Sequence, residues 1–211
     1  LHATAAEQVR FSPEALPAGE LVLHVSASSL GPPALRAAVL DAAEAVLSRG
    51  GRICCDPNAR PELMRDEEGR KALEEIVAKS FCLMPSTSDL DFLFPGEAEE
   101  AATERLLSGP AEIVAIKRGS RGATVVGRDE RHEVRGHRVE EVDPTGAGDS
   151  FCGTLIGLLV RDRPLGEAAR LANAAGAIAV TRRGPMEGNS TPGEIARFLD
   201  SDAARDGARS A

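Results

Sequence analysis

The chain has 211 residues, of which 42% are hydrophobic and 27% charged, with a formal net charge of −8 at pH 7. This composition is typical of a globular protein with one good-sized core. The acidic balance without a basic cluster argues against a nucleic-acid partner, and no apolar run is long enough to span a membrane.

The cysteines point to a reducing compartment. Cys54, Cys55, Cys82 and Cys152 lie in apolar segments and lack the spacing of a metal finger or a disulfide framework. Buried, reduced thiols are therefore predicted, together with a cytoplasmic location.

Strands and helices alternate in the first half of the chain. Short apolar, β-branched segments predict strands over residues 21–26, 52–56 and 81–84. An amphipathic helix is predicted over residues 34–47, between two prolines and two glycines, and a charged one over 66–78.

The second strand runs into Asp56-Pro-Asn-Ala-Arg60. Charged and amide side chains at the carboxyl end of a strand, in an alternating α/β chain, face the crevice where such folds bind ligands. A guanidinium binds a carboxylate through two parallel hydrogen bonds, so Arg60 is a candidate for recognising an acidic substrate. The alternative is a proline-rich connecting loop without a ligand.

A strand is also predicted over residues 112–117, followed by Arg118-Gly-Ser-Arg-Gly122 and a second strand over 123–126. This order is that of an ordinary hairpin. The charged stretch that follows reaches residue 139.

The stretch Asp143-Pro-Thr-Gly-Ala-Gly-Asp149 is where chemistry is expected. Pro144 disfavours a helix through the residue before it, and the small residues that follow leave the backbone open to a ligand. Because Asp149 opens an apolar helical run, free amides and the positive end of a helix dipole should meet here, which attracts phosphate. The alternative is a plain turn with Asp149 as the cap of the helix.

Helices are predicted over residues 149–160 and 165–180, and Thr191-Pro-Gly-Glu194 has the pattern of a helix start. This last helix is expected to end at about Leu199. Residues 1–200 are predicted to form one domain, and residues 201–211 a flexible tail.

Taken together, Asp143-Pro-Thr-Gly-Ala-Gly-Asp149 resembles the second signature of the ribokinase-like (PfkB-type) sugar kinases. The resemblance implies a three-layer α/β/α fold with a mostly parallel central sheet. It also implies an ATP-dependent kinase that phosphorylates a sugar hydroxyl. The Asp56–Arg60 pattern is similar to kinases of 2-keto-3-deoxygluconate, so a sugar acid or a ketohexose is the implied substrate.

The resemblance assigns roles to particular residues. Asp149 is the implied catalytic base, which also contacts the substrate with Arg60, and the backbone of Gly146, Ala147 and Gly148 forms the anion hole. The nucleotide is expected beside Lys117, Gly119, Gly122, Thr145, Gly148 and Asn173.

The cofactors that the resemblance implies are ATP, Mg²⁺ and the monovalent cation K⁺. The family has Pro-Asn-x-x-Glu near magnesium, whereas this chain has Pro95-Gly96-Glu97-Ala98-Glu99. Glu99 is the implied magnesium residue, acting through water. Asp143 is implied to hold K⁺ together with the loop around Gly184 and Ser190.

Nothing in the chain matches the opening third of this family, which supplies strands, much of the sugar pocket and a lid. The chain is therefore expected to be the C-terminal two thirds of a longer kinase, whose full-length form pairs as a homodimer through the lid. Two alternatives remain: a non-catalytic nucleotide-binding protein, favoured by Gly96, and an NAD(P)-dependent oxidoreductase. The second is weakened because Phe151 stands where a dinucleotide fingerprint needs a third glycine.

Overall fold

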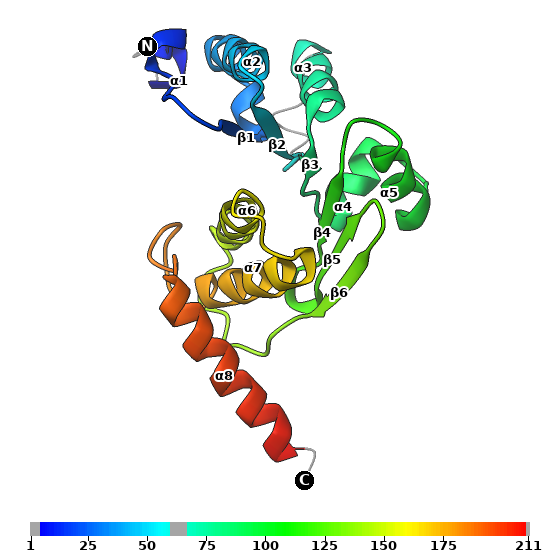
Figure 1. The fold of residues 1–211 in the computed structure, drawn as a ribbon, viewed down its shortest axis with the longest axis vertical. Coiled ribbons are helices and arrows are strands. Elements are labelled where there is room, and N and C mark those ends of the chain that lie inside the picture. Colours follow the sequence, from blue (N-terminus) through cyan, green and yellow to red (C-terminus); the bar gives the residue numbers. More distant parts are fainter. Residues whose placement is uncertain (1–4, 60–66, 210–211) are drawn as a thin grey trace. The chain divides into compact units, whose positions relative to one another are not determined.

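The computed structural model describes residues 5–59 and 67–209 (Figure 1). The chain divides into two compact units, Leu1–Ala115 and Ile116–Ala211, with the division inside one strand, β4. The described strands form a six-stranded sheet in the order β1-β2-β3-β4-β5-β6.

The first unit alternates strands with helices, as the sequence predicts. Its elements are α1 (Ala5–Gln8), η1 (Pro13–Ala15), β1 (Val22–Ser26), η2 (Ala27–Leu30), α2 (Pro33–Ser48), β2 (Arg52–Asp56), α3 (Glu67–Lys79), β3 (Cys82–Leu83), α4 (Thr87–Leu93), α5 (Glu99–Leu107) and most of β4 (Ile113–Lys117).

The strands of the first unit run parallel. Val22 of β1 pairs with Arg52 of β2, Cys54 pairs with Cys82 of β3, and Leu83 pairs with Val114 of β4. Helix α2 packs on β1 and β2, and α3 packs on β2. The carboxyl ends of these strands therefore share one edge of the sheet.

All four cysteines are buried and outside disulfide bonds, which confirms the predicted buried thiols. Three of them belong to β2 and β3, where side chains on both faces of a parallel strand are covered.

The second unit contains a short antiparallel pair and the long helices of the C-terminal half. Its elements are η3 (Gly119–Arg121), β5 (Gly122–Gly127), β6 (Arg131–Arg135), α6 (Ala147–Leu159), α7 (Leu165–Ala179) and α8 (Pro192–Arg209). Strands β5 and β6 pair antiparallel, with Ala123 opposite Val134. The predicted strands at residues 112–117 and 123–126 are neighbours in the sheet as β4 and β5, and the hairpin predicted between them stays a prediction.

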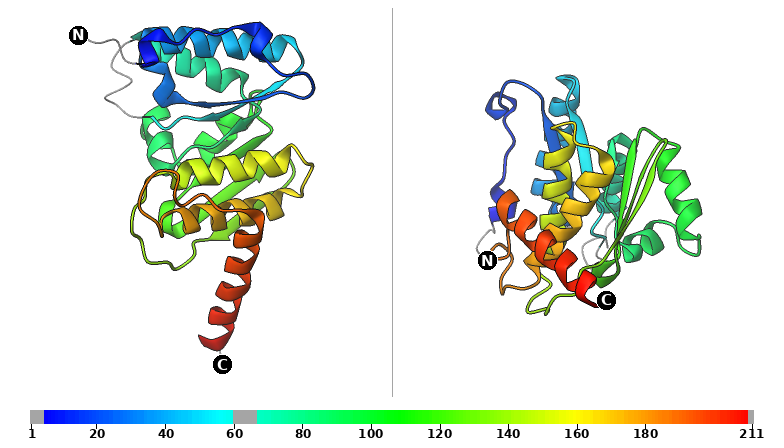
Figure 2. Two further views of the ribbon diagram at one scale, coloured as in Figure 1. Left: turned by 90° about the vertical axis from the view of Figure 1, so that its left-hand side faces the viewer. Right: turned by 60° about the horizontal axis from the view of Figure 1, so that its bottom comes forward.

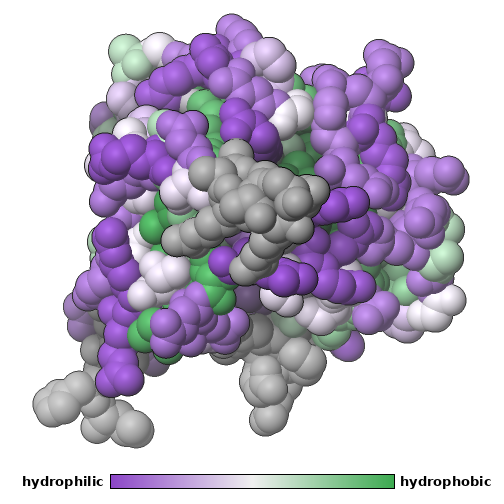
Figure 3. All heavy atoms as spheres, turned by 90° about the horizontal axis from the view of Figure 1, so that it is seen from below, coloured by the Kyte–Doolittle hydropathy of each residue, from purple (hydrophilic) through white to green (hydrophobic). Residues whose placement is uncertain are grey.

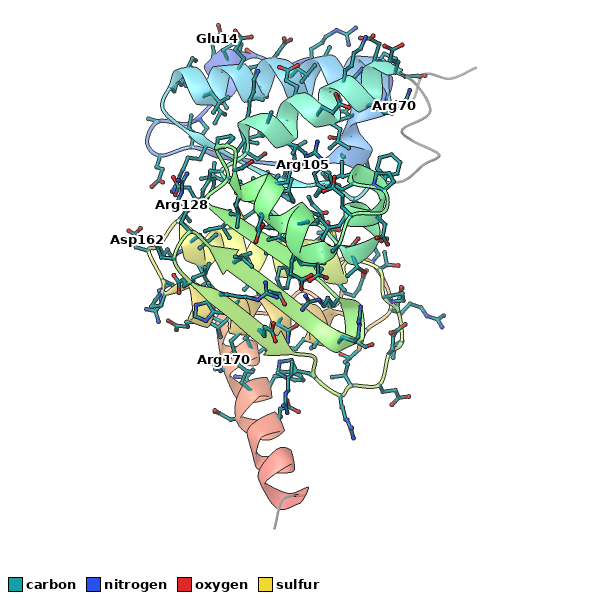
Figure 4. All side chains as sticks on the ribbon, turned by 90° about the vertical axis from the view of Figure 1, so that its right-hand side faces the viewer. Glu14, Arg70, Arg105, Arg128, Asp162 and Arg170 are labelled. Atoms are coloured by element: carbon teal, nitrogen blue, oxygen red, sulfur yellow. The ribbon has the colours of Figure 1, made fainter. Side chains whose placement is uncertain are left out.

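Helices α6 and α7 lie side by side (Figure 2), and α7 also packs against β5 and β6. The close approach follows from the alanines of α7, of which Ala168, Ala169 and Ala172 are fully buried. The turn between the two helices passes through Asp162, labelled in Figure 4, whose φ is +53°. Aspartate is one of the few residues with a side chain that adopts this conformation readily.

Helix α8 is longer than the sequence predicts. It begins as expected, because the Thr191 amide donates to Glu194 Oε2 at 2.8 Å and the Glu194 amide donates to the Thr191 hydroxyl at 3.3 Å. The predicted end near Leu199 is wrong, since the helix continues to Arg209. Alanine and arginine in this stretch are strong helix formers. The predicted flexibility of the tail stays a prediction, as does the single-domain organisation.

A second departure is α4, which the sequence analysis did not predict. It is short, and it begins with a capping box formed by Ser86 and Asp89.

The face of the molecule seen in Figure 3 is mainly hydrophilic, with smaller hydrophobic areas. Among the described residues, the large hydrophobic side chains that are exposed are Val9, Val142 and Met186. None of the described helices is both long and apolar enough to cross a bilayer.

Candidate active site

The glycine-rich stretch forms the start of α6. Gly146 is the residue before the helix and has a φ of +83°. A β-carbon at Gly146 would lie 2.3 Å from the carbonyl oxygen of Pro185. Only glycine fits at this position, because a side chain would be both strained and in contact with backbone. The loop that contains Pro185 therefore closes directly over the turn.

The first turn of α6 presents backbone amides that the helix itself cannot pair. The Ser150 amide donates to the Gly146 carbonyl at 2.9 Å, and the Ala147 amide donates to Pro144 O at 3.3 Å. The amides of Gly148 and Asp149 come before the first regular helical bond, so no helical carbonyl accepts from them. The Asp149 side chain is exposed beside them. An anion that approached the turn would meet these amides, with a carboxylate next to them.

Lys117, at the end of β4, adds positive charge at the same place. Its Nζ lies 3.6 Å from the position that a β-carbon on Gly148 would occupy. Nζ also lies 3.8 Å from the Cys152 Sγ, one turn further along α6. An ammonium beside the positive end of a helix is unfavourable in isolation and becomes favourable when an anion binds between them.

A cavity of about 510 Å³ lies in the second unit beside this turn. That volume falls within the usual range for a small-molecule site. Its lining includes six of the residues that the sequence analysis assigned to phosphate or nucleotide, namely Lys117, Gly119, Gly122, Ala147, Gly148 and Asn173. Thr145, Gly146 and Asp149 belong to the same turn but are not among the lining residues.

Asn173 is held in one orientation. It is 8% exposed, and its Nδ2 donates to the carbonyl oxygen of Arg135, at the end of β6, at 2.8 Å. This bond uses one N–H of the side-chain amide and leaves Oδ1 available to accept a hydrogen bond.

Asp143 joins the glycine turn to the loop before α8. Its Oδ1 accepts from the Thr145 amide at 3.0 Å, and its Oδ2 accepts from the Gly184 amide at 2.9 Å. Hydrogen bonds from the Thr145 hydroxyl and amide, and from the Gly184 amide, lower the pKa of Asp143 from 3.8 to about 2. Asp143 is therefore ionised at any ordinary pH.

The predicted partner of Asp143, Ser190, has a buried hydroxyl oxygen without a hydrogen-bond partner among the described residues. A carboxylate and a hydroxyl are both oxygen ligands that suit a cation, and the predicted roles of Asp143 and Ser190 in holding K⁺ stay predictions.

In the first unit, the stretch after β2 is held by polar contacts. The Asn58 amide donates to Asp56 Oδ1 at 3.1 Å, and the Asn58 side chain donates to the Ser26 hydroxyl at 3.2 Å. The Ala59 amide donates to Asp89 Oδ1 at 2.7 Å. Arg60, the predicted substrate residue, lies outside the described residues.

Asp89 is a residue that the sequence analysis missed. It is 4% exposed, and its Oδ2 accepts from the Ser86 amide and from the Ser86 hydroxyl, both at 2.6 Å. One carboxylate thus starts α4 and fixes the segment before Arg60. The sequence does carry a signal for Asp89. Pro85-Ser86-x-x-Asp89 directly follows a predicted strand, and it has the same order of a proline, a polar residue, two other residues and an acid that the family pattern was expected to have at residues 95–99.

Glu99 is the first residue of α5 and is half-buried. Gly96, three residues before it, has a φ of +80°. Pro95 follows helix α4 rather than a strand, unlike Pro85. The described residues contain no group of three or more histidine, cysteine and acidic side chains that could hold a metal ion. The roles of Glu99 and of the other site residues stay predictions.

Residues 2–192 match the family described as pfkB family carbohydrate kinase. The chain belongs to this family. Its relatives include fructokinase-1 of Oryza sativa subsp. japonica, 31% identical over 189 residues (85% of this chain and 58% of the relative). They also include the fructokinase of Vibrio alginolyticus, 29% identical over 184 residues (84% of this chain and 60% of the relative).

Two solved structures of similar chains are also sugar kinases by their descriptions. A protein described as ribokinase II from E. coli, in complex with ATP and Mg²⁺, is 39% identical with a TM-score of 0.82 over 85% of this chain and 58% of that one. A fructokinase double mutant from Vibrio cholerae O395, with fructose, ADP and potassium ion, is 25% identical with a TM-score of 0.80 over 90% of this chain and 64% of that one.

These matches confirm the predicted family and the predicted three-layer α/β/α fold with a mostly parallel sheet. The pfkB chain spans less than two thirds of the length of the relatives named above.

Proposed function

We propose that this chain carries the nucleotide site and the phosphoryl-transfer centre of an ATP-dependent sugar kinase. The observation that supports this most is the cavity at the start of α6, which is lined by Lys117 and Gly148 and lies beside the turn that carries the unpaired amides and the exposed Asp149. A site that only bound anions would not have a carboxylate at this point, because the negative charge would repel the anion. A kinase needs one beside the phosphoryl group to hold the accepting hydroxyl.

The chemistry follows from a loose transition state, in which positioning and charge stabilisation matter more than proton abstraction. Asp149 would hydrogen-bond the sugar hydroxyl, align its oxygen with the γ-phosphoryl group and accept its proton late. The Gly148 and Asp149 amides and Lys117 would stabilise the phosphoryl oxygens. The Ala147 amide, predicted to donate as well, already donates to Pro144.

Two cations are part of the proposal. Mg²⁺ would neutralise charge on the ATP phosphates, with Glu99 acting through its water shell. K⁺ would bind near Asp143 and Ser190, in keeping with the buried Ser190 hydroxyl.

The sugar is proposed from the relatives and from one motif. The relatives named above are fructokinases, which supports a ketohexose such as fructose. The Asp56–Arg60 pattern supports a sugar acid such as 2-keto-3-deoxygluconate. A panel of fructose, ribose and 2-keto-3-deoxygluconate decides between them. Arg60→Ala should reduce activity on the sugar acid more than on fructose, and equal losses would remove Arg60 from substrate selection.

A second candidate is a nucleotide-binding protein without catalysis. Gly96 favours it, because the amide side chain that the family pattern has at this position is missing. Family membership disfavours the dinucleotide oxidoreductase. Homodimer formation by a longer chain and a cytoplasmic location stay predictions.

The test uses Asp149→Asn, which keeps the size of the side chain and removes its charge. ADP formation should fall by about two orders of magnitude or more, because alignment and proton acceptance are lost together. ATP binding should remain close to that of the unaltered chain. Asp129→Asn, at an exposed turn between β5 and β6, is the matched control.

Normal turnover in Asp149→Asn would contradict the catalytic role. ATP binding without ADP formation, in the presence of every sugar tried, would instead support the non-catalytic alternative.

A further inference from the structure

The segment from Gly136 to Glu141 forms one wall of the cavity. Gly136, His137, Arg138, Val139 and Glu141 all line it. The segment is neither helix nor strand, so no regular ladder of backbone hydrogen bonds holds it. Its shape depends on individual contacts.

The two ends of this segment are fixed by backbone contacts at, or next to, residues that line the cavity. At the first end, the Gly136 amide donates to Arg121 O at 3.2 Å, and a β-carbon at Gly136 would lie 1.9 Å from Ser120 O. At the second end, the Val142 and Asp143 amides donate to the carbonyl of Val180 at 2.8 and 3.1 Å. The middle of the segment is held differently.

His137 attaches the middle of the segment to α8. Its Nδ1 lies 2.6 Å from Asp202 Oδ2, and its ring meets the ring of Phe198 edge-on, with centroids 5.0 Å apart and planes at 74°. The side chains of His137 and Asp202 are only 10% and 20% exposed. A proton on Nδ1 donates to the carboxylate, which fixes the tautomer and the plane of the ring.

Asp202 reaches His137 because α8 stays helical beyond Leu199. Ile195, Phe198 and Leu199 form the face that packs on α7, in one cluster with Ala174, Ala175 and Ile178. Asp202 lies four residues after Phe198 and three after Leu199, so it continues the same face. Figure 1 shows the end of α8 continuing past α7.

We propose that α8 is a positioning element for the nucleotide site, acting through Asp202 and Phe198 on His137. This proposal rests on the proposed function, in which the cavity binds ATP. With the contact in place, the wall is ordered before the nucleotide arrives. Without it, binding has to order the wall, and the lost freedom weakens the affinity. The phosphoryl-transfer step at Asp149 does not depend on the contact.

The test compares Asp202→Ala with Asp200→Ala, an exposed aspartate on the same helix. Hydrogen exchange of residues 136–141 is measured without nucleotide, and binding of a fluorescent ADP analogue with Mg²⁺ is measured directly. In Asp202→Ala, exchange in the segment should accelerate and the Kd should rise about tenfold, as expected for loss of a hydrogen bond to a charged group. The KM for ATP should rise with it, while kcat at saturating ATP and the KM for the sugar stay unchanged.

Asp202→Asn keeps an oxygen that accepts from a neutral His137, so its Kd should return most of the way to that of the unaltered chain. Asp200→Ala should change nothing. Unchanged exchange in Asp202→Ala, or faster exchange without weaker binding, would overturn the proposal. If the unaltered chain bound no nucleotide, the proposed function itself would be wrong, which is a different result from an unaffected variant.

Discussion

At the scale of single residues, Asp143 shows how one carboxylate links two segments of the backbone through hydrogen bonds. Both of its oxygens accept backbone amides, one from the glycine turn and one from the loop before α8. The negative charge is therefore favoured in the folded protein, as the lowered pKa of Asp143 indicates.

The pKa of Asp143 predicts a pH dependence of stability. A carboxyl whose pKa falls from 3.8 to about 2 on folding stabilises the protein above pH 3.8, and this contribution is lost as the pH falls towards 2. Asp143→Asn should be less stable than the unaltered chain at pH 7, and the difference should narrow below pH 4. Urea unfolding at several pH values measures it, with Asp129→Asn as control. A difference that stayed constant down to pH 2 would contradict the prediction.

Gly96 is the second residue whose replacement is informative. Its φ of +80° suits glycine or asparagine, and a β-carbon there would meet no atom within 4 Å. Gly96→Asn restores the family's pattern before Glu99. It should lower the Mg²⁺ concentration that gives half-maximal activity, at a stability cost within about 1 kcal/mol.

The control for this change is Gly50→Asn, because Gly50 has a φ of +75° and equally open surroundings. An unchanged magnesium dependence in Gly96→Asn, combined with an altered one in Asp89→Asn, would move the magnesium role from Glu99 to Asp89. Asp89 is also needed to start α4, so the melting temperature has to be measured alongside.

At the scale of elements, two glycines of the α6 region should respond to alanine in opposite ways. Gly146→Ala forces a side chain into a left-handed conformation against Pro185 O, and it should destabilise the protein by more than about 1 kcal/mol. It should also weaken nucleotide binding, because the turn has to move. Gly153→Ala is the control, since Gly153 is an exposed position within α6 with no atom within 4 Å of an added β-carbon.

Gly153→Ala should stabilise α6 by about 0.5–1 kcal/mol, because alanine has the higher helix propensity. Chemical unfolding of both variants gives the comparison. Equal effects of the same sign would show that the conformation of Gly146 is not required.

Most elements could be predicted because their local signals were strong. The strands around Ile53 and Val114 are short apolar runs between polar ends, and both were placed correctly. Helix α4 and the C-terminal part of α8 were not. Helix α4 is only seven residues long, too short for a clear helical period. The end of α8 was misjudged because the polar composition after Ser201 resembles a frayed end, whereas the Asp202 contact is long-range.

The site was predictable where a motif is continuous in sequence. Six predicted residues line the cavity. Most of them belong to the glycine turn or to the stretch that follows the strand ending at Lys117, and the conformation of these short stretches is determined by neighbouring residues in the sequence. Asp89 was missed although Pro85-Ser86-x-x-Asp89 carries a local signal. His137 could not be found from the sequence, because its partner Asp202 lies 65 residues away and no local pattern encodes such a pairing.

At the scale of the whole molecule, ligand binding should increase the free energy of unfolding of the chain. A nucleotide that binds only the folded chain, at a hundred times its Kd, adds about 2.7 kcal/mol. For a protein of this size that corresponds to a rise in melting temperature of about 5–10 °C. Thermal unfolding with ADP and Mg²⁺, compared with Mg²⁺ alone, measures the shift. Asp149→Asn should keep it, and its absence at every concentration would contradict nucleotide binding.

The division of the chain inside β4 limits how the protein can be dissected. Ala115 and Ile116, on either side of the division, are both fully buried. A fragment cut there would begin or end in the middle of a strand and would place a charged terminus at a position that the intact chain buries. Separately expressed halves should therefore aggregate, and single substitutions in the undivided chain are the sounder way to assign activity to either half.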